Sequence, residues 1–89
     1  MFRLFVGSNN KTKRLELDKA VKCVARYYKG FTYYTATGFW EGVKEKSVVF
    51  EISGTKKRDI DKLSKELCNI LAQQAVGIQR IPEMSFISI

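Results

Sequence analysis

The residues best suited to binding chemistry lie in the segment TATGFWEGVKEKSVVFEIS, at positions 35–53. It places an aromatic side chain, Trp40, close to a carboxylate, Glu45, in what the flanking glycines predict to be a hairpin. An aromatic ring can stack on a base or cover a cation, and a carboxylate can accept hydrogen bonds. Gly38 within the first strand predicts a bulge or a close backbone approach, with the turn near Gly42. The structural alternative is a bulged hairpin in which the Trp packs on the sheet and the Glu pairs with a lysine.

Two dense basic runs provide candidate anion contacts. Each follows a predicted strand and precedes a predicted helix, whose free N-terminal N–H groups also favour anions. We expect the first and third strands to be adjacent, parallel and central, so that both loops lie at one end of the sheet. The residues expected to neutralise phosphate are Lys11, Lys13, Arg14, Lys56, Lys57 and Arg58. The alternative is that both runs are ordinary solvated loops.

The residue inventory excludes several kinds of site. The chain has no histidine, and its two cysteines, Cys23 and Cys68, match no zinc-binding spacing. Ser-His-Asp triads, Cys-His pairs and Cys/His zinc sites are therefore ruled out, and no metal or cofactor is expected. Both cysteines fall on predicted helices, where we expect small hydrophobic residues at the margin of the core.

Patterns of apolar residues predict the elements that must position these side chains. Alternation and enrichment in aromatic and β-branched residues indicate strands. Apolar residues that recur every three or four positions indicate amphipathic helices. The predicted order is strand 2–6, helix 15–28, strand 31–40, strand 46–53, helix 58–74 and strand 75–81, with a short final strand at 84–89.

The order β-α-β-β-α-β is typical of the ferredoxin-like, or split βαβ, fold. It predicts an α+β protein with an antiparallel sheet and both helices on one face, as a single domain over residues 1–89. Gly30 is expected to end the first helix. Asp59 or Asp61 is expected to cap the second helix and to complement its dipole.

The size and charge of the chain indicate the kind of partner. Its net charge of +7 favours nucleic acid, a nucleotide or an acidic protein surface as the partner, and the alternative is that the charge only keeps the protein soluble. At 89 residues the domain is close to the lower limit for independent stability, so self-association is expected. No stretch approaches the roughly 18 apolar residues needed to cross a bilayer. The start lacks the apolar region of a signal peptide, and we expect a cytoplasmic protein without membrane contact.

A wider pattern extends from Gly30 to Val76. It comprises the run GFTYYTATGFWEGVKEKSVVFEI, then a helix, then LAQQAVGIQ. This pattern resembles a family of uncharacterised small bacterial and phage proteins and, more distantly, the phage S-adenosylmethionine (SAM) lyases. The resemblance implies a PII-like ferredoxin fold, assembly as a trimer and a ligand site between subunits. It also implies that Glu45 matches the acidic residue of the lyase pocket and that Trp40 matches an aromatic residue of that pocket, which is a Tyr in the lyases. Gln73 would match the Gln that precedes the final strand.

Three functions follow as hypotheses. The leading one is a non-enzymatic PII-like oligomer that holds a small anionic or nucleotide-type ligand between subunits. Its biological role would be that of a phage anti-defence protein that sequesters a host signal. Tyr34 and Trp40 would stack on the base, and Glu45 or Gln73 would hydrogen-bond its polar edges. The second is a SAM lyase with Glu45 as the catalytic residue, acting through positioning and electrostatics. The third is an inhibitor that binds single-stranded nucleic acid or a protein.

The nucleic-acid hypothesis depends on aromatic residues in the predicted strands, because ferredoxin-like sheets bind single-stranded RNA by stacking bases on such residues. The candidates are Phe31, Tyr33, Tyr34, Phe50 and Trp40. Against it, KSVVFEIS lacks the basic-Gly-aromatic pattern of an RNA recognition motif, and Glu51 would repel phosphate. The same aromatic residues would also suit a subunit interface.

Overall fold

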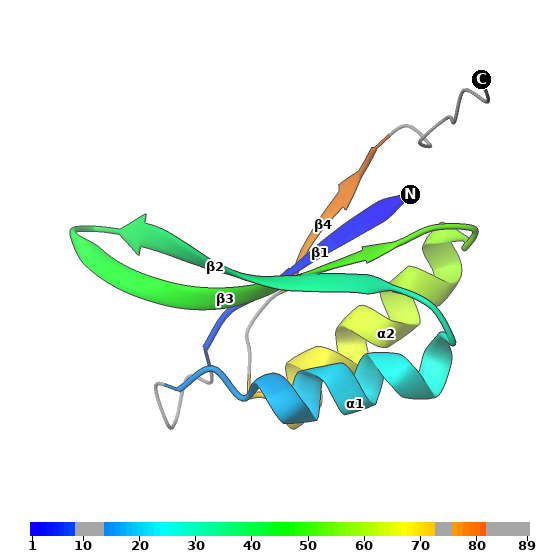
Figure 1. Cartoon of the computed structure of the whole chain (residues 1–89), viewed down its shortest axis with the longest axis horizontal. Helices are drawn as coiled ribbons and strands as arrows, with labels where there is room; N and C mark the ends of the chain where they lie inside the picture. Colours follow the sequence, from blue (N-terminus) through cyan, green and yellow to red (C-terminus); the bar gives the residue numbers. More distant parts are fainter. Residues whose placement is uncertain (9–13, 73–75, 82–89) are drawn as a thin grey trace, which may run out of the picture.

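The computed structural model describes residues 1–8, 14–72 and 76–81 (Figure 1). Within these residues the elements are β1 (Phe2–Val6), α1 (Leu17–Tyr27), β2 (Thr32–Trp40), β3 (Val43–Ile52), α2 (Lys57–Ile70) and β4 (Gly77–Arg80). Both helices lie on one side of a single sheet, and the α+β ferredoxin-like fold is confirmed. The predicted start of the last strand at Ala75 and the predicted final strand at 84–89 lie outside the described residues.

The order of strands in the sheet is β2-β3-β1-β4, and every neighbouring pair is antiparallel. The β1–β3 pairing runs from Phe2 opposite Ile52 to Val6 opposite Val48. The prediction that these two strands are parallel is therefore wrong. The hairpin between β2 and β3 reverses the chain, so β3 runs against β2 on one side and against β1 on the other. As a consequence, β1 and β3 end at opposite ends of the sheet.

The core lies between the sheet and the two helices. Alternate residues of β1 and β3 face the helices, because side chains alternate between the two faces of a strand. The buried apolar side chains of the core cluster are Phe2, Leu4, Val6, Ala20, Cys23, Val24, Val48, Phe50, Ile52, Ile60, Leu63, Leu67 and Leu71. The predicted apolar spacing is thus confirmed in both helices. Cys23 is the expected small core residue, and Cys68 is half-buried.

The helix ends differ from the expected ones in detail. α1 ends at Tyr27, followed by an extended residue, so Gly30 does not cap it. The N-cap position of α2 makes no side-chain cap hydrogen bond. Asp59 lies in the first turn, where it complements the dipole, and Asp61 instead accepts a hydrogen bond of 2.6 Å from Lys57 Nζ. Neither helix of the described chain is long and apolar enough to cross a membrane.

A two-residue turn at Glu41 and Gly42 joins β2 to β3. Their φ angles are 49° and 78°, and positive φ at both positions is typical of the type I′ turn, whose twist suits a hairpin. The pairing is continuous through Gly38 opposite Glu45, and a Cβ added at Gly38 would meet nothing within 4 Å. The predicted bulge at Gly38 is therefore wrong. The tight turn also lets β3 begin at Val43, earlier than expected.

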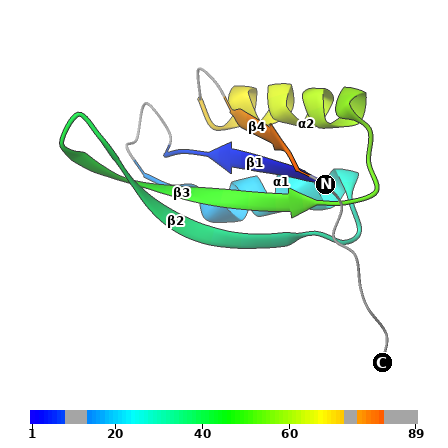
Figure 2. The same cartoon turned by 90° about the horizontal axis from the view of Figure 1, so that it is seen from above.

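The end of this hairpin projects beyond the rest of the sheet. β1 pairs with β3 only as far as Val48, so residues 37–40 pair with residues 43–46 alone. We call these two segments the ribbon. The ribbon extends past the ends of both helices, and its described side chains are exposed (Figure 2).

Candidate functional site

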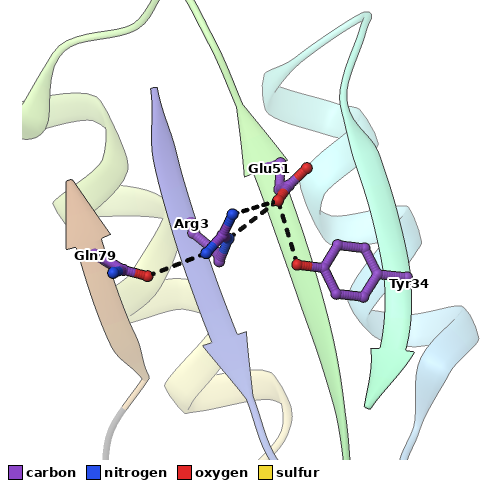
Figure 3. A network of polar contacts seen from close by, with 4 residues as sticks. All are labelled: Arg3, Tyr34, Glu51 and Gln79. Carbon is purple, nitrogen blue, oxygen red and sulfur yellow. Dashed lines mark hydrogen bonds and ion pairs between the residues drawn. The ribbon is translucent and has the colours of Figure 1, made fainter. Parts of the chain in front are cut away.

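Four polar side chains, one from each strand, meet on the face of the sheet opposite the helices, here called the helix-free face (Figure 3). Arg3 Nε and Nη2 lie 3.0 and 2.8 Å from Glu51 Oε2. Arg3 Nη1 donates a hydrogen bond of 3.4 Å to Gln79 Oε1, and the Tyr34 hydroxyl donates one of 3.2 Å to Glu51 Oε2. The register explains the network, since Arg3 stands opposite Glu51 on one side and Gln79 on the other.

An apolar row lies beside this network on the same face. Phe5, Val49 and Tyr34 stand opposite one another on β1, β3 and β2. Val49 is only 2% exposed, whereas Phe5 and Tyr34 each remain 42% exposed. On β4, Gly77 stands opposite Phe5, and a Cβ there would lie 3.4 Å from Phe5 Cβ, so the glycine leaves room for the ring. The helix-free face therefore offers exposed aromatic surface next to hydrogen-bonding groups.

The helix-free face carries little of the positive charge of the chain. Its described strand positions hold one cation, Arg3, and two carboxylates, Glu45 and Glu51, in a chain of net charge +7. Arg3 and Glu51 neutralise each other. The excess cations therefore lie on the helices, the loops and the other side of the sheet. A phosphate-rich polymer would find few partners on this face, whereas a compact ligand or a protein surface would not be repelled.

The residues predicted to form one pocket are spread along the hairpin. Tyr34 belongs to the polar network, whereas Glu45 and Trp40 lie on the ribbon. Tyr34 stands opposite Val49, four residues from Glu45, so about 14 Å of strand separates the two predicted contacts. Gln73 lies outside the described residues. One subunit therefore does not bring Tyr34 and Glu45 into a common pocket.

Because β1 and β3 are antiparallel, the chain leaves these two strands at opposite ends of the sheet. The first basic run follows β1. Its Lys11 and Lys13 lie outside the described residues, and Arg14 is exposed. The second run, at 56–58, follows β3 and is exposed, and Lys57 Nζ pairs with a carboxylate oxygen of Asp61. The prediction that the chain leaves both strands at one end of the sheet, on which the shared anion site depended, is therefore wrong.

A surface hollow at the start of α1 also fails to provide an anion site. Its lining residues are Leu15, Glu16, Leu17, Asp18 and Lys19. Glu16 pairs with Lys19 at 2.9 Å, and Asp18 lies in the first turn of the helix. Carboxylates thus already complement the positive end of the helix dipole, which disfavours a bound anion there.

Most aromatic residues predicted to stack on bases lie on the helix-covered side of the sheet. Phe50 is fully buried, and the ring centroids of Phe31 and Tyr33 lie 5.9 and 6.0 Å from its own. These three rings form a cluster at the edge of the core. Among the predicted aromatics whose side chains are described, Tyr34 alone lies on the helix-free face.

A cluster of titratable side chains joins the two helices. Glu66 of α2 accepts hydrogen bonds from the Tyr27 hydroxyl and from Arg26 Nη2 of α1, the latter at 2.7 Å, and these bonds lower the pKa of its carboxyl. The same contact raises the pKa of the Tyr27 hydroxyl, while burial raises the pKa of the Cys23 thiol. The hydrogen bonds of Glu66 therefore link the two helices. In the described parts of the chain, no group of cysteine and acidic side chains could hold a metal ion.

The strand patterns alone do not single out Arg3, Phe5 or Gln79. In FRLFV, however, Arg3 and Phe5 alternate with the core positions, so the alternation contains enough information to place both on the helix-free face. The position of Gln79 follows only from the register of β4 against β1. Glu51, expected to repel phosphate, is neutralised by an arginine from a strand distant in sequence.

No family model and no curated protein matches the chain. Among solved structures, a phage SAM lyase in its apo state is similar, with a TM-score of 0.63 and 24% identity over 86% of this chain and 74% of that chain. A CutA1 mutant from Pyrococcus horikoshii OT3 is similar with a TM-score of 0.48 and 18% identity, over 96% of this chain and 87% of that chain. The first similarity confirms the expected resemblance to phage SAM lyases at the level of the fold.

Proposed function

We propose that this protein binds a small nucleotide-type ligand, without catalysis, in clefts between the subunits of a PII-like homo-oligomer, with a trimer as the simplest assembly. The observation that carries the proposal is the apolar row beside the polar network on the helix-free face. Phe5 and Tyr34 offer exposed rings for a base. Arg3, Glu51 and Gln79 offer donors and acceptors for its edges. Ligand sites commonly combine apolar walls with a few such polar groups.

The ligand is assigned to a site between subunits because one subunit leaves it uncovered. A sheet face contacts only one side of a base, whereas ligand sites usually bury most of the ligand surface. Tyr34 and Glu45 are separated by about 14 Å of strand, and a second subunit laid over the helix-free face would cover both. The low charge of this face also lets two chains of net charge +7 approach each other there.

The remaining predicted contacts are kept in the proposal. Trp40, Glu45 and Gln73 stay predicted ligand contacts. The candidate phosphate contacts are Lys11, Lys13 and Arg14, which follow β1 in the sequence, and Lys56, Lys57 and Arg58, which follow β3. A ligand is therefore expected to contact only one of these two basic runs from any given subunit. The biological role that fits such a protein is sequestration of a host nucleotide signal by a phage, in the cytoplasm.

Replacement of Tyr34 by alanine is expected to weaken nucleotide binding about tenfold, because stacking of a base on an aromatic side chain contributes about 1–3 kcal/mol. Native mass spectrometry of the full chain with mono-, di- and cyclic nucleotides measures binding and assembly together. Tyr33→Ala is the matched control, because Tyr33 is 45% exposed but lies on the helix-covered face of the same strand. Equal loss in both variants, or a wild-type chain that binds no nucleotide, would contradict the proposal.

A SAM lyase is the second candidate function. It is favoured by the exposed carboxylate of Glu45, which lies on the same face as Tyr34 and Glu51. SAM carries a sulfonium cation, which carboxylates and aromatic rings stabilise. In the reaction, the substrate's own carboxylate oxygen attacks the carbon bonded to sulfur, and the C–S bond breaks with its electron pair going to sulfur. The products are methylthioadenosine and homoserine lactone, and positioning with electrostatics suffices for such an intramolecular step.

The lyase candidate predicts that both products accumulate when the protein is incubated with SAM and analysed by chromatography. It further predicts less product from Glu45→Gln than from Glu41→Gln, because only the first change removes a carboxylate from the helix-free side of the hairpin. Glu41 is a suitable control because it lies in the exposed turn. Absence of product above background from the wild-type chain would eliminate the lyase candidate.

A further inference from the structure

The side of α2 that points away from the sheet carries a row of exposed cations. Both helices lie on one side of the sheet (Figure 1). The buried residues of α2, which pack toward the sheet, are Ile60, Leu63, Ser64 and Leu67. Because successive residues of an α-helix are turned by about 100°, the exposed Arg58, Lys62 and Lys65 fall on the opposite side of α2.

α1 adds a cation to the same outer surface. Its buried residues are Ala20, Cys23 and Val24. Lys22 is exposed on the side of α1 opposite to them. Asp18, one turn before Lys22, is an exposed carboxylate on this side, so the cations of the outer surface are in excess. We define the basic helix face as Lys22, Arg58, Lys62 and Lys65.

The carboxylates of the helices do not neutralise the basic helix face. The ion pairs at the helices are Lys19–Glu16, Arg26–Glu66 and Lys57–Asp61. None of the four cations of the basic helix face forms an ion pair with a residue that the structure describes. Arg58 and Lys62 are four residues apart, a spacing at which like charges destabilise a helix, and Lys65 adds a third charge to the row. An anionic partner would relieve this repulsion.

We infer that the basic helix face binds the phosphate backbone of double-stranded DNA without reading its sequence. Lysine and arginine side chains that contact phosphates release condensed counterions, and this release drives sequence-independent binding. The helix-free face, on the other side of the molecule, holds one cation and two carboxylates at its described strand positions. This asymmetry of charge steers a polyanion toward the helices. The inference goes beyond the proposed ligand site and does not depend on it.

Other macromolecules fit the basic helix face less well, because it lacks an apolar anchor. Single strands are bound by stacking of bases on aromatic side chains, and helices that bind membranes insert an apolar side. Protein interfaces are depleted in lysine and enriched in aromatic residues. The large exposed apolar side chains of the described helices are Tyr27 and Ile70, which lie near the helix C-termini and outside the row of cations.

Duplex RNA also fits less well than duplex DNA. RNA helices are recognised through their 2′-hydroxyl groups as well as their phosphates. The four side chains of the basic helix face donate hydrogen bonds but accept none, so they match phosphate oxygens rather than hydroxyl groups. The dense phosphate charge of the DNA duplex is therefore the partner that we assign to this face.

Fluorescence anisotropy of a short labelled DNA duplex, titrated with the full chain at several salt concentrations, tests the inference. Four phosphate contacts predict that the affinity falls about 150-fold between about 50 and 200 mM salt. Lys62→Gln/Lys65→Gln removes two contacts, so this fall is expected to shrink to about 12-fold. If several subunits contact the duplex, both slopes increase together and their ratio of about two stays the same.

Lys44→Gln/Lys46→Gln is the matched control. It lowers the net charge by the same amount, but its exposed positions lie on β3 and not on the helices, so it is expected to keep the wild-type slope. Arg58 is left unchanged because it is also a candidate phosphate contact of the proposed ligand. Circular dichroism checks that both variants are folded.

The inference is overturned if the wild-type chain does not bind the duplex, or if both double variants change the salt dependence equally. Tighter binding to duplex RNA, to the separated strands, to polyglutamate or to phosphatidylserine vesicles would also overturn it, since the partner would then be of another class. Duplexes of unrelated sequence are expected to bind equally, and a strong preference for one of them would contradict sequence-independent binding.

Native mass spectrometry with nucleotides separates this inference from the proposed function. Lys62→Gln/Lys65→Gln is expected to bind nucleotides like the wild type, and a parallel loss of nucleotide and DNA binding would contradict a separate surface. A chain that binds the duplex but no nucleotide would contradict only the proposed function. A chain that binds nucleotide but no duplex would contradict only the present inference.

Discussion

Replacement of Phe50 by alanine is expected to lower the free energy of unfolding by about 3–5 kcal/mol, the range for a large aromatic removed from a core. Phe50 is fully buried on β3, and its ring lies against those of Phe31 and Tyr33. The substitution leaves a cavity and removes both aromatic contacts. A domain of this size is expected to be stable by about 4–13 kcal/mol in total, so the loss is a large part of the free energy of unfolding.

Urea denaturation followed by circular dichroism measures this effect. Phe39→Ala is the matched control, because Phe39 lies on the adjacent strand β2 of the same hairpin and is 71% exposed. In Phe39→Ala the free energy of unfolding, extrapolated to low protein concentration, is expected to fall by no more than about 0.5 kcal/mol. Both variants are measured over a dilution series, because assembly adds a concentration-dependent contribution to stability. Similar losses in the dilute limit would contradict the packing described for Phe50.

Replacement of Arg3 by alanine is expected to lower the free energy of unfolding by about 1–3 kcal/mol, the range for hydrogen bonds to charged groups. The side chains of Arg3 and Glu51 are only 29% and 22% exposed, so solvent screens their attraction incompletely. Without Arg3, the Glu51 carboxylate keeps only the Tyr34 hydroxyl as a donor from the network, and Gln79 loses its partner on β1. The variant therefore weakens the link between β1 and both of its neighbours.

A double-mutant cycle with Glu51→Gln isolates this ion pair. Glu51→Gln is expected to be less harmful in the Arg3→Ala background than in the wild type, because the unpaired carboxylate is then absent. Arg26→Ala is the control, since the Arg26–Glu66 pair on the helices is more exposed, at 59% and 33%, and its loss is expected to be smaller. If Arg3→Ala proves no more harmful than Arg26→Ala, the network on the helix-free face does not stabilise the sheet as described.

Much of the fold could be predicted from local patterns. The alternation in FRLFV identified β1, and the helical spacing of Ile60, Leu63 and Leu67 identified α2 and its buried face. Such patterns are readable because strand and helix periods are properties of neighbouring residues. The ends of the strands and helices were harder to predict from the sequence. β3, for example, begins where the Glu41–Gly42 turn permits pairing with β2 to start.

The candidate site could be predicted only in part. Tyr34 and Glu45 were expected to share a pocket, but about 14 Å of strand lies between them. The two basic runs were expected to follow strands that end at one end of the sheet, and the antiparallel pairing of β1 with β3 puts the ends of these strands at opposite ends. Arg3 and Gln79 belong to no recognisable sequence motif. They are in contact only because β1 lies between β3 and β4 in the sheet.

By itself, then, the sequence determined the order of the elements, the residues that face the core, the excess of positive charge and the absence of histidine chemistry. These are local or compositional properties that hold whatever the chain folds into. The tertiary structure alone decided strand direction and register, and with them which side chains from distant segments share the helix-free face. Register brings Arg3 beside Glu51 and Gln79, because the pairing of a strand with its neighbours decides which side chains from distant segments stand opposite each other.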